Sequence, residues 1–186
     1  TGCMAQRYKE EITQEIPEVD AILGTTSYGD IVKALNEAQA GNVFQEFRDI
    51  NELPEDSGRR VLTTGGHFGY LKIAEGCDKH CTYCIIPSLR GRFRSVPEER
   101  LLAQAEYMAS QGVKELILVA QETTVYGTDL YGKKTLHILL KKLCQIKGIR
   151  WIRVLYCYPE EIYDELVQVM KEEKKICNYL DLPIQH

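Results

Sequence analysis

The residues with the clearest chemical potential are three cysteines within eight positions. Cys77, Cys81 and Cys84 form the pattern C-x3-C-x2-C, directly after the apolar segment 70–74. Three thiolates at this spacing suit an iron–sulfur cluster that binds the protein through three irons and leaves one iron open to an external ligand. The spacing therefore predicts a cluster that does chemistry rather than one that only braces the fold.

Two other uses of these cysteines have to be weighed. A structural zinc site needs four closed ligands, normally in two pairs, and only His67 or His80, at unusual spacings, would complete the set. A disulfide framework is disfavoured because the cysteine count, seven, is odd and no secretory signal is present. A zinc-binding interaction module without catalysis stays as the alternative from a different class of function.

The bulk composition is that of an ordinary globular protein. The 186 residues are 44% hydrophobic and 27% charged, enough for one good core or for a domain and a fraction. No apolar run reaches the length of a membrane span and the first residues show no targeting pattern, so we expect no membrane partner and a cytoplasmic location. The net charge of −4 argues weakly against RNA as substrate, since the basic side chains cluster only at Arg90, Arg92 and Arg94.

The first part of the chain is predicted to be a piece of an α/β domain. Helices are expected over 5–15 and 28–40, on either side of a short apolar stretch at 21–24. Residues 42–68 mix charge with Pro and Gly and show little periodicity, which is typical of a domain linker.

From residue 69 onward, strand and helix patterns alternate four times. Ser95 is expected to cap the first of the helices, with Pro97 in its first turn. The predicted helices cover 95–111, 135–146 and 160–172, and the predicted strands cover 70–74, 115–120, 151–156 and 179–184. This alternation indicates a parallel β/α architecture whose functional residues follow the carboxyl ends of the strands.

Polar residues at these strand ends are further candidates. Gln121 and Glu122 follow the second strand, where they either line a site or belong to a polar exit loop capped by neighbouring threonines. Arg153 lies inside the third, otherwise apolar strand, where it either binds the carboxylate of a ligand, forms an internal salt bridge or lies on a solvent-facing edge. Gln185 and His186 end the fourth strand and could face the same edge.

The sequence around the cysteines resembles that of a known family. C-x3-C-x2-C with Tyr83 before the last cysteine is similar to the motif of the radical S-adenosylmethionine (SAM) superfamily, and the flanks 69–77 (GYLKIAEGC) and 84–91 (CIIPSLRG) resemble those of the methylthiotransferases. The resemblance covers nearly the whole chain. Ser88 after Ile-Pro, and the final Gln-His, make the chain most similar to the branch that modifies an aspartate of small-subunit ribosomal protein S-twelve (the RimO type).

The resemblance implies an α/β fold in two parts: residues 1–58 as the C-terminal part of the N-terminal methylthiotransferase domain plus linker, and 59–186 as an incomplete parallel (β/α) radical SAM barrel. It implies a 4Fe-4S cluster on Cys77, Cys81 and Cys84, with SAM on the open iron. Tyr83 would help to bind the adenine, Gln121 and Glu122 would lie near the methionyl group or the substrate, and Arg153 is the candidate for the SAM carboxylate. Cys3 would be one ligand of a second 4Fe-4S cluster whose other ligands precede residue 1.

The activity implied is transfer of a methylthio group to the β-carbon of an aspartate in the ribosomal protein, with an electron donor as a further partner. The same chemistry on a tRNA adenosine is the alternative substrate. Because the chain starts without Met and breaks off after its fourth strand, we expect it to be a fragment of a longer enzyme.

Overall fold

The computed structural model describes residues 1–54 and 61–183, and the chain divides into two compact units. The N-terminal unit contains Thr1–Arg60 together with Cys77–Arg92, and the sheet unit contains Val61–Gly76 together with Phe93–His186. The domain boundary predicted between residues 58 and 59 lies outside the described residues and stays a prediction.

The N-terminal unit is built on two short parallel strands. β1 (Ala21–Leu23) pairs in register with β2 (Phe44–Glu46), and the chain between them forms η1 (Tyr28–Asp30) and α3 (Ile31–Gln39). The buried side chains of Ile22, Leu23 and Ala34 make its core. The remaining helices of the unit are α1 (Cys3–Arg7), α2 (Lys9–Glu15) and α4 (Ile86–Arg90).

Three details of this unit differ from the expectation. The predicted helix over 5–15 starts earlier and is interrupted at Tyr8, which ends α1 and precedes α2. The segment 42–68, predicted as a linker, contains β2 and the first residue of a later strand. A three-residue strand has too few positions to show an alternating pattern, and this explains why the sequence hides β2.

The sheet unit carries a four-stranded parallel sheet in the order β3-β6-β7-β8. Its strands are β3 (Phe68–Lys72), β6 (Glu115–Val119), β7 (Trp151–Val154) and β8 (Ile176–Leu180). Each new strand is added beside the previous one, and the helices between them are α5 (Glu98–Ser110), α7 (Leu136–Cys144) and α8 (Asp164–Glu172). The predicted α/β class and parallel sheet are therefore confirmed.

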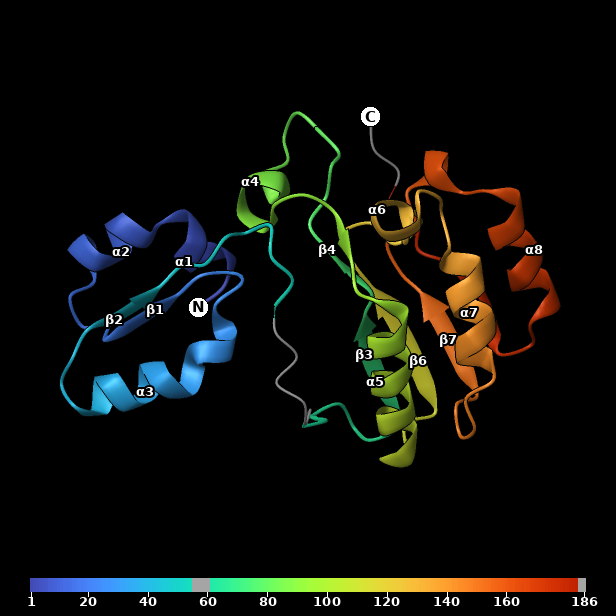
Figure 1. Ribbon diagram of the computed structural model, residues 1–186, viewed down its shortest axis with the longest axis horizontal. Coiled ribbons are helices and arrows are strands. Elements are labelled where there is room, and N and C mark those ends of the chain that lie inside the picture. The colour runs from blue at the N-terminus through green and yellow to red at the C-terminus, as the bar shows by residue number, and fades with distance from the viewer. Residues whose placement is uncertain (55–60, 184–186) are drawn as a thin grey trace. The chain divides into compact units, whose positions relative to one another are not determined.

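One face of this sheet packs on the helices. Figure 1 shows α5 and α7 in front of the strands. Alternate strand residues are fully or almost fully buried, among them Leu71, Leu116, Leu118, Ile152 and Val154. They meet the leucine-rich face of α7 and the buried side chains of α5 and α8. The alternation places the other strand residues on the opposite face.

Several boundaries shift relative to the prediction. The strand expected over 70–74 is two strands, because β4 (Ala74–Glu75) leaves the sheet and pairs antiparallel with β5 (Arg94–Ser95). The strand expected over 179–184 is β8, which ends at Leu180 and contains an irregularity where it pairs with β7. Gln185 and His186 lie outside the described residues. Among the described residues, no helix combines the length and apolar character that a membrane span needs.

Ser95 does not cap α5, contrary to the prediction. That helix begins at Glu98 after Pro97, whereas Ser95 lies in β5 and is fully buried. The Ser95 hydroxyl donates to Asp129 Oδ1 (2.6 Å) and accepts from the Gly127 N–H (2.8 Å), and the Ser95 N–H donates to Asp129 Oδ2 (2.8 Å). These bonds join β5 to the start of α6 (Thr128–Tyr131).

We predict that Ser95→Ala lowers the free energy of unfolding by about 1–3 kcal/mol, because the buried Gly127 N–H loses its acceptor. Urea unfolding measures the change. The matched control is Ser110→Ala, whose hydroxyl donates to Tyr107 O at the exposed end of α5 and whose loss should cost less than about 0.5 kcal/mol. Equal losses in the two variants would contradict the prediction.

Candidate functional site

The three predicted ligands lie on one segment of the N-terminal unit, which we call the cysteine loop (residues 77–91). Cys77, Cys81 and Cys84 are each half-buried, and residues 76–85 form neither helix nor strand. A turn brings the Cys84 N–H to Cys81 O (2.9 Å), and the Lys79 N–H donates to Cys77 Sγ (3.4 Å). The thiols are thus exposed enough to bind a ligand and are held on a short, irregular backbone.

The base of the cysteine loop is closed by hydrogen bonds. The Cys77 N–H donates to Gly91 O (3.2 Å), and the Gly91 N–H donates to Pro87 O (2.9 Å) at the end of α4. Asn51 Oδ1 accepts from the Arg92 N–H (3.0 Å), while the Asn51 side-chain amide donates to Asp49 Oδ1 (3.0 Å). Sequence reasoning missed Asn51, because it lies in the segment predicted to be a linker.

Gly91 is required at this closure for two reasons. Its φ is 71°, a left-handed value that side chains disfavour. A Cβ on Gly91 would also lie 2.6 Å from Ile50 O and 2.7 Å from Asn51 Oδ1. The backbone of the preceding segment can therefore press against the end of the loop only when position 91 has no side chain.

A pocket of about 560 Å³ opens beside the first cysteine. Its lining includes Cys77 with Ile50, His80, Pro87 and Arg92, all of them residues of the N-terminal unit. Asp78 also lines this pocket, so it joins a thiol to both an acidic and a basic side chain.

The donor chemistry of the loop fits an iron–sulfur cluster. Three soft sulfur donors lie on backbone that can adjust without breaking a helix or a sheet. Within the described residues, no three His, Cys, Asp or Glu side chains are gathered closely enough to hold a metal ion. The three cysteines therefore lie on one loop, but their thiols do not yet meet at one centre. We expect them to converge when the cluster binds.

The remaining cysteines of the sheet unit are poorly suited to bind metal. Cys144 and Cys157 are buried, and this burial raises the pKa of each thiol to about 11. Burial also raises the pKa of Cys177. Metals bind the thiolate, so thiols that stay protonated at neutral pH are weak competitors for iron. The prediction of buried thiols is confirmed for Cys144 and Cys157, whereas Cys177 is half-buried.

Cys3 has a partner that the sequence did not reveal. Its Sγ accepts a hydrogen bond from Arg90 Nε (3.2 Å), the last residue of α4, and both residues belong to the N-terminal unit. One arginine of the basic cluster at Arg90, Arg92 and Arg94 thus contacts the cysteine predicted to hold a second cluster.

Gln121 and Glu122 follow β6 but face different groups. Gln121 Oε1 accepts from the Gly76 N–H (2.9 Å), so this side chain fixes the residue from which the cysteine loop departs. Glu122 is 3% exposed, and its Oε1 accepts from the N–H and the hydroxyl of Thr124. The polar exit loop expected as one alternative is therefore present, with Gln121 bonded to Gly76 and Glu122 to Thr124. Any contact of the two with SAM or substrate stays a prediction.

Arg153 and Tyr83 lie in contrasting surroundings. Arg153 Nε donates to Glu115 Oε1 (2.7 Å), at the amino end of β6, and the guanidinium lies over the ring of Tyr179. The internal acidic partner is thus present, and a role toward SAM stays a prediction. Tyr83 is 67% exposed on the cysteine loop, where its ring is open to a ligand.

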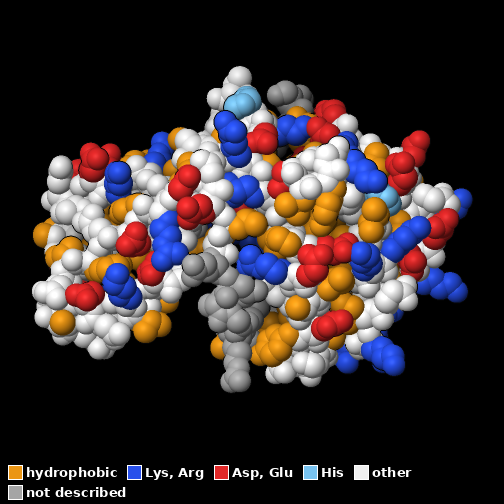
Figure 2. Space-filling model, viewed as in Figure 1, with side chains coloured by type: hydrophobic (Ala, Val, Ile, Leu, Met, Phe, Trp, Pro, Cys, Tyr) orange, Lys and Arg blue, Asp and Glu red, His pale blue; other side chains and the backbone are white. Residues whose placement is uncertain are grey.

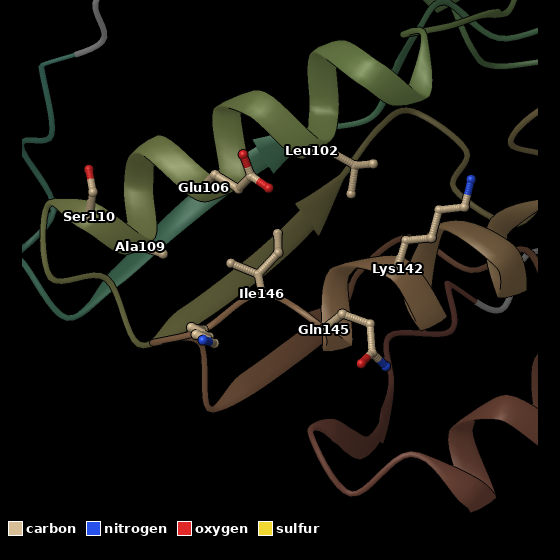
Figure 3. Close-up of a pocket in the computed structure, with 8 residues that line it drawn as sticks. Leu102, Glu106, Ala109, Ser110, Lys142, Gln145 and Ile146 are labelled. Atoms are coloured by element: carbon tan, nitrogen blue, oxygen red, sulfur yellow. The ribbon is translucent and has the colours of Figure 1, made fainter.

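Other surface features lie away from these residues. A pocket of about 590 Å³ between α5 and the end of α7 is lined by Leu102, Glu106 and Ile146 among others (Figure 3), none of which is a predicted site residue. On the face shown in Figure 2, acidic and basic side chains are interspersed rather than gathered by sign. That face lacks the continuous basic surface that binding of an RNA backbone favours.

Comparison with known proteins decides the family. The family model described as "Radical SAM superfamily" matches residues 71–186. The chain belongs to this superfamily. A solved member, the radical SAM methyltransferase TsrM from Kitasatospora setae with cobalamin and a [4Fe-4S] cluster bound, matches 64% of this chain and 22% of its own, with a TM-score of 0.51 and 16% identity. At that identity the likeness shows the fold, and it confirms the predicted partial radical SAM barrel.

Closer relatives in sequence are the proteins named "Ribosomal protein uS12 methylthiotransferase RimO". Those of Lachnoclostridium phytofermentans, Clostridium botulinum (strain Eklund 17B) and Clostridioides difficile are 63%, 53% and 50% identical over the whole chain. The chain spans only 42% of the length of each. The cofactors expected from the resemblance, a 4Fe-4S cluster and SAM, are those of the superfamily, and TsrM has been solved with the cluster and with a SAM analogue.

We predict that Gly91→Ala lowers the free energy of unfolding by at least about 1–2 kcal/mol, because its φ is left-handed, and that it also reduces iron uptake. The added Cβ would force the cysteine loop away from Ile50. Urea unfolding and iron analysis after anaerobic reconstitution measure the two effects. Gly29→Ala is the matched control, since a Cβ there meets no atom within 4 Å. Normal iron content in the Gly91 variant would refute the role given to this closure.

Proposed function

We propose that this chain is the catalytic part of a methylthiotransferase that adds a methylthio group to the β-carbon of an aspartate in ribosomal protein uS12. The observation that carries the proposal is 63% identity, over the whole chain, to a protein named for that activity. Two observations support it: three half-buried cysteines lie on one loop, and residues 71–186 match the radical SAM family model.

In this proposal each part of the site has a distinct task. Cys77, Cys81 and Cys84 hold the first 4Fe-4S cluster, and Cys3 contributes to the second. When bound, the cluster and SAM supply a carbon radical by reductive cleavage of SAM, with electrons from an external donor. Gln121 fixes the departure of the cysteine loop through Gly76. The exposed ring of Tyr83 is available to the adenine of SAM.

The substrate is tested by a direct comparison of uS12 with tRNA. Net charge −4 and the interspersed charges on the face in Figure 2 favour a protein over tRNA. The test incubates the full-length protein anaerobically with SAM, a reductant and either uS12 or tRNA, and follows product mass. Gain of one methylthio group on a uS12 aspartate is the expected result. Modification of tRNA alone would contradict the assignment of uS12 as the substrate. The proposal also includes a cytoplasmic location for the enzyme.

We predict that alanine at Cys77, Cys81 or Cys84 sharply lowers iron and sulfide content after anaerobic reconstitution, because each substitution removes one of three thiolates. Cys144→Ala is the control, since that thiol is buried with a raised pKa. Iron analysis and visible absorbance report the outcome. Tightly bound zinc without iron uptake would instead establish the non-catalytic zinc-binding module.

We predict that Cys3→Ala in the full-length enzyme keeps SAM cleavage but abolishes sulfur insertion, because the three loop cysteines are intact while the second cluster loses a ligand. Release of 5′-deoxyadenosine and methylthiolation of uS12 are measured on the same sample. Methylthiolation at the wild-type rate would show that Cys3 is only a thiol hydrogen-bonded to Arg90.

A further inference from the structure

Tyr156 has an unusual backbone conformation. Its φ is 57°, and every other positive φ recorded among the described residues belongs to a glycine. A left-handed conformation is strained for a bulky side chain and persists only where surrounding contacts impose it. Such residues occur preferentially at functional sites, so the contacts around Tyr156 need an explanation.

Hydrogen bonds hold the Tyr156 backbone from both sides. Its N–H donates to Asp181 Oδ2 (3.2 Å), just after β8. Its carbonyl accepts from the N–H (3.1 Å) and from the hydroxyl (2.9 Å) of Thr123, just after β6. Tyr156 itself follows β7. The carboxyl ends of three neighbouring strands are therefore joined at this one residue.

The residues after Tyr156 are fixed in the same way. The Cys157 N–H donates to Asp181 O (2.9 Å), and the Tyr158 N–H donates to Thr124 Oγ1 (3.1 Å). Thr123, Thr124 and Cys157 are all fully buried. The strained conformation is thus held by buried residues on the Thr123 side and by the half-buried Asp181 on the other.

The Tyr156 side chain does not take part in that burial. It is 52% exposed, although its backbone neighbours are enclosed. Within the described part of the chain, its ring makes no aromatic or cation–π contact that the structure records. The hydrogen bonds therefore hold the Tyr156 backbone in a strained conformation that leaves the ring exposed. The ring lies at the carboxyl edge of the sheet, where parallel α/β proteins bind their ligands.

We infer that Tyr156 is a substrate-contact residue whose ring packs against the peptide segment that carries the modified side chain. The inference rests on the proposed function, because it takes the substrate to be a protein. A tyrosine suits such a segment, since it offers apolar area, a polar tip and little conformational entropy to lose.

Within the sheet unit, Tyr156 and the residue before the cysteine loop lie at different strands. The loop follows Gly76, whose N–H donates to Gln121 after β6. Tyr156 follows β7, two strands from β3 in the sheet order, a spacing of about 10 Å. A substrate that contacts Tyr156 therefore lies along the carboxyl edge of the sheet beside β7.

The test uses the full-length reconstituted enzyme and the variant Tyr156→Gly. Glycine adopts the left-handed conformation without strain, so this variant keeps the backbone conformation at position 156 while it removes the ring. It should nevertheless raise the KM for uS12 about tenfold, which is the loss expected for one aromatic anchor. The KM for SAM is measured in the same assay.

Trp151→Ala is the matched control, because Trp151 is equally exposed (52%) but lies at the amino end of β7, the strand that Tyr156 follows. It should leave the KM for uS12 within about twofold of wild type. A rise in the KM for SAM in Tyr156→Gly would place the ring on the cofactor and overturn the inference, as would an unchanged KM for uS12. If the wild-type enzyme does not modify uS12 at all, the proposed function fails and the inference fails with it.

Discussion

Parallel pairing of β3, β6, β7 and β8 is the constraint on which the rest of the sheet unit depends. Because parallel strands all end at the same edge, the residues that follow these strands lie side by side along that edge. Gln121, Thr123, Tyr156 and Asp181 are such residues, and hydrogen bonds link Tyr156 to Thr123 and to Asp181 and join Gln121 to Gly76, which follows β4. The helices cover one face of the sheet with leucine-rich surfaces, and this burial supplies the stability that polar loops at the edge do not.

The contact between Gln121 and Gly76 has a wider importance than its single hydrogen bond suggests. Gly76 is the last residue of the sheet unit before the cysteine loop, and its φ of 76° turns the chain out of β4. A rigid strand end thereby fixes the start of an irregular segment. At the other end of the loop, Gly91 and Asn51 fix its closure. The loop is thus anchored at both ends while its three thiols lie on backbone without helix or strand.

Sequence patterns predicted the features that rest on local chemistry or on long apolar runs. The spacing of the three cysteines and the run Glu115–Ala120 indicated a thiolate loop and a buried parallel strand. Features set by distant partners were not visible. β4 and β5 have two residues each, which is too short to show periodicity. The sequence around Ser95 predicts a helix cap, and only the structure shows that its partner is Asp129. A tyrosine at position 156 does not by itself indicate a left-handed backbone. Hydrogen bonds from Thr123 and to Asp181, which follow other strands, hold that conformation.

The positions of the cysteines show how the chain distinguishes thiols that bind metal from thiols that pack. Cys144 and Cys157 are enclosed by the apolar layer and the strand-end network, where burial raises their pKa and keeps them protonated. The loop cysteines are half-buried and lie on backbone that forms neither helix nor strand. Convergence of three side chains on one centre costs conformational entropy, and metal–sulfur bonds offset that cost only on binding. Because the loop is anchored at both ends, less conformational entropy remains to be lost when the cluster binds. The closures at Gly76 and Gly91 therefore favour cluster binding, although neither residue is a ligand.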